Sequence, residues 1–96
     1  MIFEIQDKTG RRIHLTMERW KHILNEHPIL FDQIENIEQT LITPLTFVES
    51  TSSENVKYYY RYYKNIKLKA KCLLVVVKYL NGDGFVIISF YVDIIK

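Results

Sequence analysis

The chain has one cysteine, Cys72, among its 96 residues. A single cysteine excludes an intramolecular disulfide and a zinc site built from several cysteines. Cys72 lies in the apolar run CLLVVV, where we expect a buried, unreactive thiol. No run approaches the roughly 18 apolar residues of a membrane-spanning helix, and the segment MIFEIQDKTGRR lacks the apolar core of a signal peptide. We therefore expect a cytoplasmic protein with no membrane partner.

Charge of one sign is missing from two long segments. Residues 26–54 contain no lysine or arginine, and residues 57–78 contain no acid. The bases of the second segment are Lys57, Arg61, Lys64, Lys67, Lys69, Lys71 and Lys78. If they share one face, that face is a candidate surface for a polyanion. The alternative is that the lysines face solvent and protect strand edges.

Two catalytic motifs are also absent. Without HExxH, or a nearby cluster of His, Cys and carboxylates, we expect no metal and no other cofactor. Without GxSxG, nucleophilic hydrolase chemistry has no support. In KHILNEHP, His22 and His27 are five positions apart, which turns them about 140° from each other on a helix. Two ligands of one metal need a spacing of three or four.

The N-terminal half predicts a hairpin followed by two helices, within one domain over residues 1–96. IFEIQ and RRIHL alternate around the turn DKTG, as in a β-hairpin. Thr16 is the expected N-cap of a helix over 17–26, which Pro28 ends. Apolar spacing predicts a second helix over 31–42, closed by Pro44.

The wheel of the first helix divides its side chains between two faces. Met17, Trp20 and Leu24 form the expected buried stripe, and Ile23 and His27 lie at its margin. His22 points to the polar face.

The second half predicts four strands, LTFVES, VKYYYRYY, KCLLVVVKYL and FVIISFYVDII. The step NGDG predicts a tight hairpin between the last two. LLVVV and FVII lack alternation, so both faces of these strands should be covered. We therefore expect the α+β class: an N-terminal β-hairpin, two α-helices, and then a four-stranded antiparallel sheet with the helices on one face.

The tract KYYYRYYK has two possible roles. As a strand it places Tyr59, Arg61 and Tyr63 on one face. That face could stack RNA bases while Arg61 contacts phosphate, with Lys57 and Lys64 beside it. The alternative is structural, because tyrosine suits a half-buried sheet face.

On the last strand, Ser89 and Tyr91 project to one side of an otherwise apolar segment. Their hydroxyls must find partners or reach a surface. Lys78, on the neighbouring strand, could bring its ammonium to the same region.

These features together resemble the phage-associated branch of the barnase–EndoU–colicin–RelE-like (BECR-fold) nucleases. The resemblance covers nearly the whole chain. It rests on Trp20, His22, Ile23, His27, Pro28, Thr40, Leu41, Pro44 and Val75–Lys78. Two departures are Ile29, where the family usually has glutamate, and Ser-Phe-Tyr, where Thr-Ala-Tyr is usual.

The resemblance implies a curved, barnase/RelE-like sheet and a metal-independent endoribonuclease. The ribose 2′-OH would attack the adjacent phosphate and leave a 2′,3′-cyclic phosphate and a 5′-OH. It implies His22 as the leading acid or base, with Arg61 and Lys78 stabilising phosphate charge. Ser89 and Tyr91 would position substrate, and His27 would support the helix end or the edge of the site.

The candidate catalytic residues are thus His22, Arg61, Ser89, Tyr91 and His27, and the candidate RNA-binding residues are Lys57, Tyr59, Tyr63, Lys64 and Lys78. Four of the first group, His22, Arg61, Ser89 and Tyr91, should line one concavity on the basic side of the sheet. The implied partners are RNA and an antitoxin or immunity protein, for a toxin of a toxin–antitoxin pair or a mobile-element effector. The alternatives are a non-catalytic RNA- or protein-binding module and a purely structural partner domain.

Overall fold

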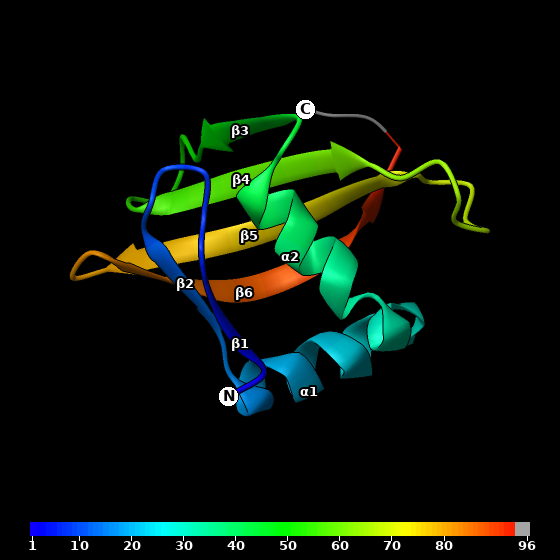
Figure 1. The fold of residues 1–96 in the computed structure, drawn as a ribbon, viewed down its shortest axis with the longest axis horizontal. Coiled ribbons are helices and arrows are strands. Elements are labelled where there is room, and N and C mark those ends of the chain that lie inside the picture. Colours follow the sequence, from blue (N-terminus) through cyan, green and yellow to red (C-terminus); the bar gives the residue numbers. More distant parts are fainter. Residues whose placement is uncertain (94–96) are drawn as a thin grey trace.

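Six strands form one sheet, and the helices lie between its second and third strands in the chain (Figure 1). The structure is a computed structural model that describes residues 1–93. Its elements are β1 (Phe3–Gln6), β2 (Arg12–Leu15), α1 (Met17–Glu26), the 3₁₀ helix η1 (Pro28–Asp32), α2 (Ile34–Ile42), β3 (Thr46–Glu49), β4 (Val56–Tyr62), β5 (Cys72–Leu80) and β6 (Asp83–Val92). No helix within these residues is long and apolar enough to cross a membrane.

The sheet has the strand order β1-β2-β6-β5-β4-β3, and it is mixed. All neighbouring strands are antiparallel except β2 and β6, which pair in parallel through Ile13 opposite Gly84 and His14 opposite Phe85. The α+β class, the N-terminal hairpin and the two helices are therefore confirmed. The separate four-stranded antiparallel sheet is wrong, because the hairpin extends the sheet at β6.

The burial of β2 shows why it joins the sheet. Ile13, His14 and Leu15 are all buried, although consecutive strand residues point to opposite faces. A strand buried on both faces lies inside a sheet, where its backbone groups are paired on both sides.

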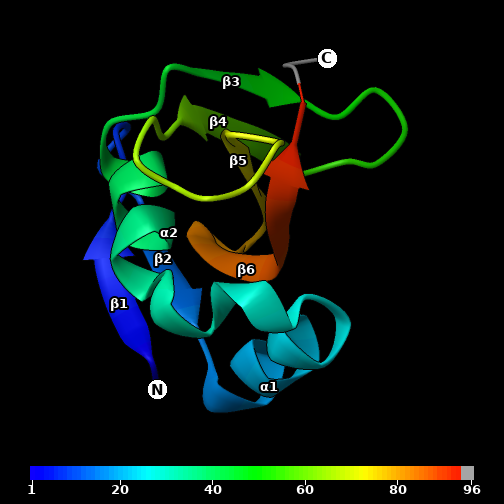
Figure 2. The same ribbon diagram turned by 90° about the vertical axis from the view of Figure 1, so that its right-hand side faces the viewer.

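The centre of the sheet follows the expectation from unbroken apolar runs. Every residue of Cys72–Val77 on β5 is buried, between β4 and β6. Leu73, Val75 and Val77 belong to the helix-side core, whereas Cys72, Leu74 and Val76 belong to a second cluster on the opposite face. A register shift between Val76 and Val77 marks a bulge, and β6 bends along its length (Figure 2). The last predicted strand extends to Ile94 and Ile95, which lie outside the described residues.

The two helices take different positions against the sheet. α2 crosses its face and packs on β5, β4 and β1, while α1 lies along the β6 side (Figures 1 and 2). Both helices contribute to one core, because Trp20 and Ile23 of α1 belong to the same buried cluster as Ile37 and Leu41 of α2. The N-cap of α1 is Thr16, whose Oγ1 accepts from Arg19 N at 3.2 Å. Its buried residues are Trp20 and Ile23, whereas Met17, predicted to be buried, is 48% exposed.

The second predicted helix is divided. Residues Pro28–Asp32 form η1, and α2 begins only at Ile34. Gln33 lies between them with φ −110° and ψ 15°, outside regular helix geometry. The apolar residues whose spacing predicted this helix still face the core, since Leu30, Ile37 and Leu41 are all fully buried.

Candidate functional site

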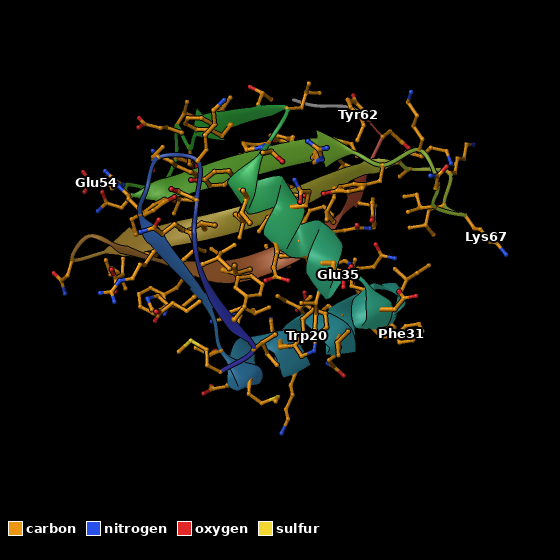
Figure 3. All side chains as sticks on the ribbon, viewed as in Figure 1. Trp20, Phe31, Glu35, Glu54, Tyr62 and Lys67 are labelled. Carbon is orange, nitrogen blue, oxygen red and sulfur yellow. The ribbon has the colours of Figure 1, made fainter. Side chains whose placement is uncertain are left out.

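A pocket of about 260 Å³ lies where η1, the loop over residues 63–71 and the end of β6 meet. We call it the His27 pocket. Its lining residues are His27, Ile29, Leu30, Leu68, Lys69, Ala70, Phe90 and Tyr91. Figure 3 places Phe31, on η1, and Lys67, at the tip of the loop, at the same end of the molecule. The pocket therefore combines an apolar wall with the most basic part of the chain.

His27 stands at the junction of α1 and η1. Its backbone N–H donates to Ile23 O at 2.7 Å, and its carbonyl accepts from Leu30 N at 3.1 Å. Its ring stacks on Phe90, with centroids 5.2 Å apart and planes at 20°. Within residues 1–93, neither ring nitrogen takes part in a hydrogen bond or ion pair. The backbone and the stack therefore fix the imidazole and leave its nitrogens available.

Tyr91 brings a phenol to the same pocket. Its hydroxyl donates to Gln33 Oε1 at 2.7 Å, and Asn36 Nδ2 lies 3.4 Å from it as a donor. Burial raises the pKa of Tyr91, although the hydrogen bond from Asn36 opposes this effect. The hydroxyl therefore keeps its proton through neutral pH and is oriented by α2.

Lys69 supplies the cation of the pocket. It takes part in no salt bridge within the described chain. The neighbouring Lys71 is held differently, since its Nζ donates to Ile66 O at 2.8 Å. Lys64 and Lys67 are exposed on the same loop. The segment KNIKLKA was not predicted to line a pocket, although its pattern indicates this. Ile66 and Leu68 alternate with lysines, so one side of the loop faces inward.

The structure does not bring the four expected catalytic residues together. Tyr91 lines the His27 pocket, whereas His22, Arg61 and Ser89 are not among its lining residues. His22 lies on α1 with its side chain 49% exposed and Nε2 3.2 Å from Glu26 Oε1. Ser89 is fully buried, and its hydroxyl donates to Leu74 O at 2.8 Å. The Ser89 hydroxyl thus satisfies a backbone carbonyl inside the sheet.

Arg61 and Tyr63 fasten α2 to the sheet. Arg61 donates from Nη1 to Thr43 O at 2.6 Å, at the end of α2, while its buried Nε has no hydrogen-bond partner within residues 1–93. Tyr63 donates to Asn36 O at 2.8 Å, and its hydroxyl lies 2.9 Å from Thr40 Oγ1. These two side chains share a face, as the strand pattern predicts, but that face is covered by α2.

The other candidate RNA-binding residues are spread over the molecule. Tyr59 has no exposed surface, so no ring face is open to a base. Lys78 is exposed on β5, opposite Val56 on one side and Phe85 on the other. Lys57 lines a different pocket. Lys64 is therefore the candidate that lies in the loop beside the His27 pocket.

The fold and the pocket define this chain as an α+β domain with a six-stranded mixed sheet and a basic, apolar-walled pocket at one end. No group of three or more His, Cys, Asp or Glu side chains within residues 1–93 is placed to hold a metal ion. No family model matches the chain, and neither a curated protein nor a solved structure matches it significantly.

Proposed function

We propose that this chain is a cytoplasmic, metal-independent endoribonuclease whose site is the His27 pocket. The observation that carries the proposal is that His27, Tyr91 and Lys69 line one pocket, since these residues carry an imidazole, a phenol and an ammonium group. Transesterification of RNA needs a base, an acid and a cation, and these groups can fill the three roles. The resemblance of the sequence to BECR-fold nucleases points to the same reaction.

In this reaction the ribose 2′ oxygen forms a bond to phosphorus while the bond from phosphorus to the 5′ oxygen breaks. His27 takes the proton of the 2′-OH, because an imidazole exchanges protons near neutral pH. Tyr91 gives its proton to the leaving 5′ oxygen. An alkoxide is a much stronger base than a phenolate, so this transfer stays favourable although the pKa of Tyr91 is raised. Proton exchange with water then removes the extra proton from His27 and returns a proton to Tyr91.

The remaining parts of the pocket serve binding. Lys69 stabilises the charge that develops on the phosphorane. The apolar wall of Ile29, Leu68 and Ala70, next to the ring of Phe90, suits a base that has left its stack. His22, the leading residue of the sequence-based hypothesis, has no role in this arrangement. An antitoxin or immunity protein that covers the pocket remains part of the proposal.

The test is RNA cleavage in the presence of EDTA, with analysis of the product ends. We expect 2′,3′-cyclic phosphate and 5′-OH ends. His27→Ala should lower the rate by about 10²-fold or more, whereas the matched variant His22→Ala should keep it. Full activity of His27→Ala, with its fold confirmed by circular dichroism, would refute the assignment.

A non-catalytic RNA-binding module is the second candidate. The observation that favours it is the hydroxyl of Tyr91, which already donates to Gln33 and is not free. In this case, RNA would bind with a steep dependence on salt, and no cyclic phosphate would form.

A further inference from the structure

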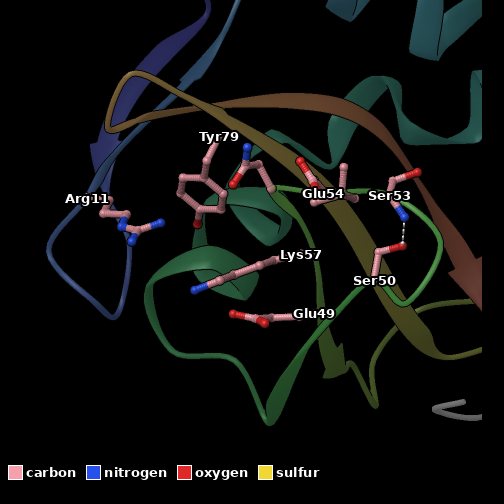
Figure 4. A pocket seen from close by; sticks show the side chains of 9 residues that line it. Arg11, Glu49, Ser50, Ser53, Glu54, Lys57 and Tyr79 are labelled. Carbon is pink, nitrogen blue, oxygen red and sulfur yellow. Dashed lines mark hydrogen bonds between the residues drawn. The ribbon is translucent and has the colours of Figure 1, made fainter.

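A second pocket, of about 410 Å³, is lined by residues from the end of β3, the start of β4 and the end of β5 (Figure 4). We call it the Arg11 pocket. Its lining residues are Arg11, Glu49, Ser50, Ser53, Glu54, Asn55, Val56, Lys57 and Tyr79. Figure 3 shows Glu54 at the end of the molecule opposite Lys67, so this pocket is separate from the His27 pocket. Its volume is in the range of about 300–1,000 Å³ that is typical of small-molecule sites.

Two cations of this pocket lie against aromatic rings instead of carboxylates. The guanidinium of Arg11 lies 4.8 Å from the centroid of Tyr79. The Nζ of Lys57 lies 5.4 Å from the same centroid and 5.3 Å from that of Phe47. Within residues 1–93, neither cation forms a salt bridge. Both cations therefore lie over aromatic rings and form no salt bridge with the carboxylates of the described residues.

Two carboxylates of the same pocket are also unpaired. Glu49 is the direct cross-strand partner of Lys57, a position from which an ion pair would ordinarily form. Nevertheless, neither Glu49 nor Glu54 forms a salt bridge within the described residues. Two cations and two carboxylates thus line one pocket without forming a salt bridge with one another.

Hydrogen bonds outside the cavity hold the walls of the pocket in place. The Tyr79 hydroxyl donates to Asp7 Oδ2 at 2.8 Å, and Arg11 N donates to Asp7 Oδ1 at 3.0 Å. On the other side, Ser50 Oγ accepts from Ser53 N at 3.1 Å and shapes the turn after β3. Tyr79 N donates to Asn55 O at 2.7 Å. The charged groups therefore project from a framework that does not have to form on binding.

The balance of charge selects the class of ligand. A simple anion would gain from Arg11 and Lys57, but it would be repelled by Glu49 and Glu54. A ligand that carries both an anionic group and hydrogen-bond donors can satisfy all four side chains. A phosphate suits the guanidinium and the ammonium, and the two hydroxyls of a ribose diol suit a carboxylate.

We propose that the Arg11 pocket binds a ribonucleotide, with its 5′ phosphate on Arg11 and Lys57 and its 2′,3′-diol on Glu49 and Glu54. The ligand is either a free nucleotide or the last nucleotide at the 3′ end of an RNA, since both carry this pair of groups. The proposal rests on this pocket alone and does not depend on RNA cleavage at His27.

The experiment is a titration of the isotope-labelled protein with AMP, followed by NMR. Backbone signals of residues 49–57 and of Arg11 should shift, whereas those of the 63–71 loop should not. 2′-Deoxy-AMP and inorganic phosphate should each bind at least about tenfold more weakly. Absence of AMP binding, or equal affinity for phosphate and AMP, would overturn the proposal.

Variants test each half of the ligand. Arg11→Met and Lys57→Met keep much of the apolar stem over Tyr79 and should each weaken AMP binding by about tenfold. Glu49→Gln with Glu54→Gln should remove the preference for AMP over 2′-deoxy-AMP. Lys21→Met, on α1, is the matched control and should change neither value. Equal losses in Lys21→Met and Lys57→Met would refute a specific phosphate site.

The source of the nucleotide is settled with short RNA oligomers in the His27→Ala protein. An oligomer that ends in a free 3′-OH should shift residues 49–57 if the pocket holds RNA ends, and the same oligomer with a 3′ phosphate should not. Binding of AMP without binding of either oligomer assigns the pocket to free nucleotides. Identical shifts with both oligomers would contradict recognition of the diol.

Discussion

The phenol of Tyr59 donates a hydrogen bond of 2.6 Å to Oδ2 of Asp7, which lies 52 positions earlier in the chain. Tyr79 donates to the same oxygen at 2.8 Å, and the two phenol hydroxyls also contact each other. Oδ1 of Asp7 accepts from Thr9 N and from Arg11 N, within the β1–β2 turn. One buried carboxylate thus connects the N-terminal hairpin to β4 and β5.

The first prediction concerns the stability that Asp7 provides. Asp7→Asn replaces one acceptor oxygen of the carboxylate by an NH₂ group, which is itself a donor. This NH₂ group would face the hydroxyls or backbone N–H groups that now donate to the carboxylate. The free energy of unfolding should fall by about 2 kcal/mol or more, because buried donors lose their acceptor. Urea denaturation of the variant and of the wild-type protein at pH 7 measures this difference. Asp93→Asn, a change of an exposed carboxylate, is the control and should have little effect.

The second prediction is the pH dependence of the same contribution. Burial raises the pKa of the Asp7 carboxyl, but hydrogen bonds from Tyr59, Thr9, Tyr79 and the backbone of Arg11 outweigh this, so the pKa is lowered overall. The stabilisation is complete above the unfolded value of about 3.9 and is lost as pH falls through the lower folded value. The loss of stability of the wild-type protein between pH 5 and pH 2 should therefore be smaller in Asp7→Asn. Equal losses in the two proteins would contradict this prediction.

The third prediction concerns Gly84, where β2 meets β6. A Cβ on this residue would lie 2.5 Å from Ile13 Cδ1 and 2.8 Å from Val77 Cγ1. Gly84→Ala should therefore destabilise the protein by about 1–3 kcal/mol through overpacking. The added change Ile13→Val removes the closest methyl group and should recover part of the loss. Additive destabilisation in the double variant, measured by urea denaturation, would show that this contact is not the cause.

The sequence predicts correctly those parts of the fold that depend on residues close together in the chain. The step NGDG predicts a tight hairpin, and Asn81 and Gly82 have φ values of 54° and 89°, as a type I′ turn requires. The unbroken run on β5 likewise indicated a central strand. The parallel pairing of β2 with β6 could not be predicted in this way. Ile13 and Gly84 are distant in sequence, and nothing local to either specifies the other as a partner.

In the candidate site, too, the features that depend on nearby residues could be predicted, whereas those that depend on distant residues could not. Alternation along β4 correctly places Tyr59 and Arg61 on one face, but whether that face is open depends on where α2 packs. The helical wheel correctly makes His22 polar. His27 was expected only at the helix end or the edge of the site, and its pocket could not be predicted because Lys69 and Phe90, which complete it, come from a loop and a strand far along the chain.

The fourth prediction concerns Tyr91 as the proton donor in RNA cleavage. Tyr91→Phe should lower kcat by about 10²-fold. Because the pKa of Tyr91 is raised above its ordinary value of 10.0, the phenol stays protonated from pH 6 to pH 9, and the factor should be constant over this range. Tyr63→Phe, which also removes a hydrogen bond to α2, is the matched control and should leave kcat nearly unchanged.

A modified substrate separates proton donation from a purely structural effect of Tyr91→Phe. If the leaving 5′ oxygen of a dinucleotide is replaced by sulfur, the leaving group no longer needs a proton. Tyr91→Phe and the wild-type protein should then cleave at similar rates. A defect of the same size on both substrates would assign Tyr91 to the folding of the pocket.

The fifth prediction concerns the basic loop and can be measured without cleavage. In His27→Ala protein, the affinity for single-stranded RNA should decrease as salt rises, because phosphate contacts release counterions. Lys64→Met and Lys67→Met should each reduce the slope of log K against log salt by about 0.7, the value for one contact to a single strand. Lys21→Met should leave the slope unchanged. Lys64 and Lys67 belong to the loop that lines the His27 pocket. Unchanged slopes in both variants would therefore show that RNA does not bind at this loop, and they would contradict RNA cleavage in the His27 pocket.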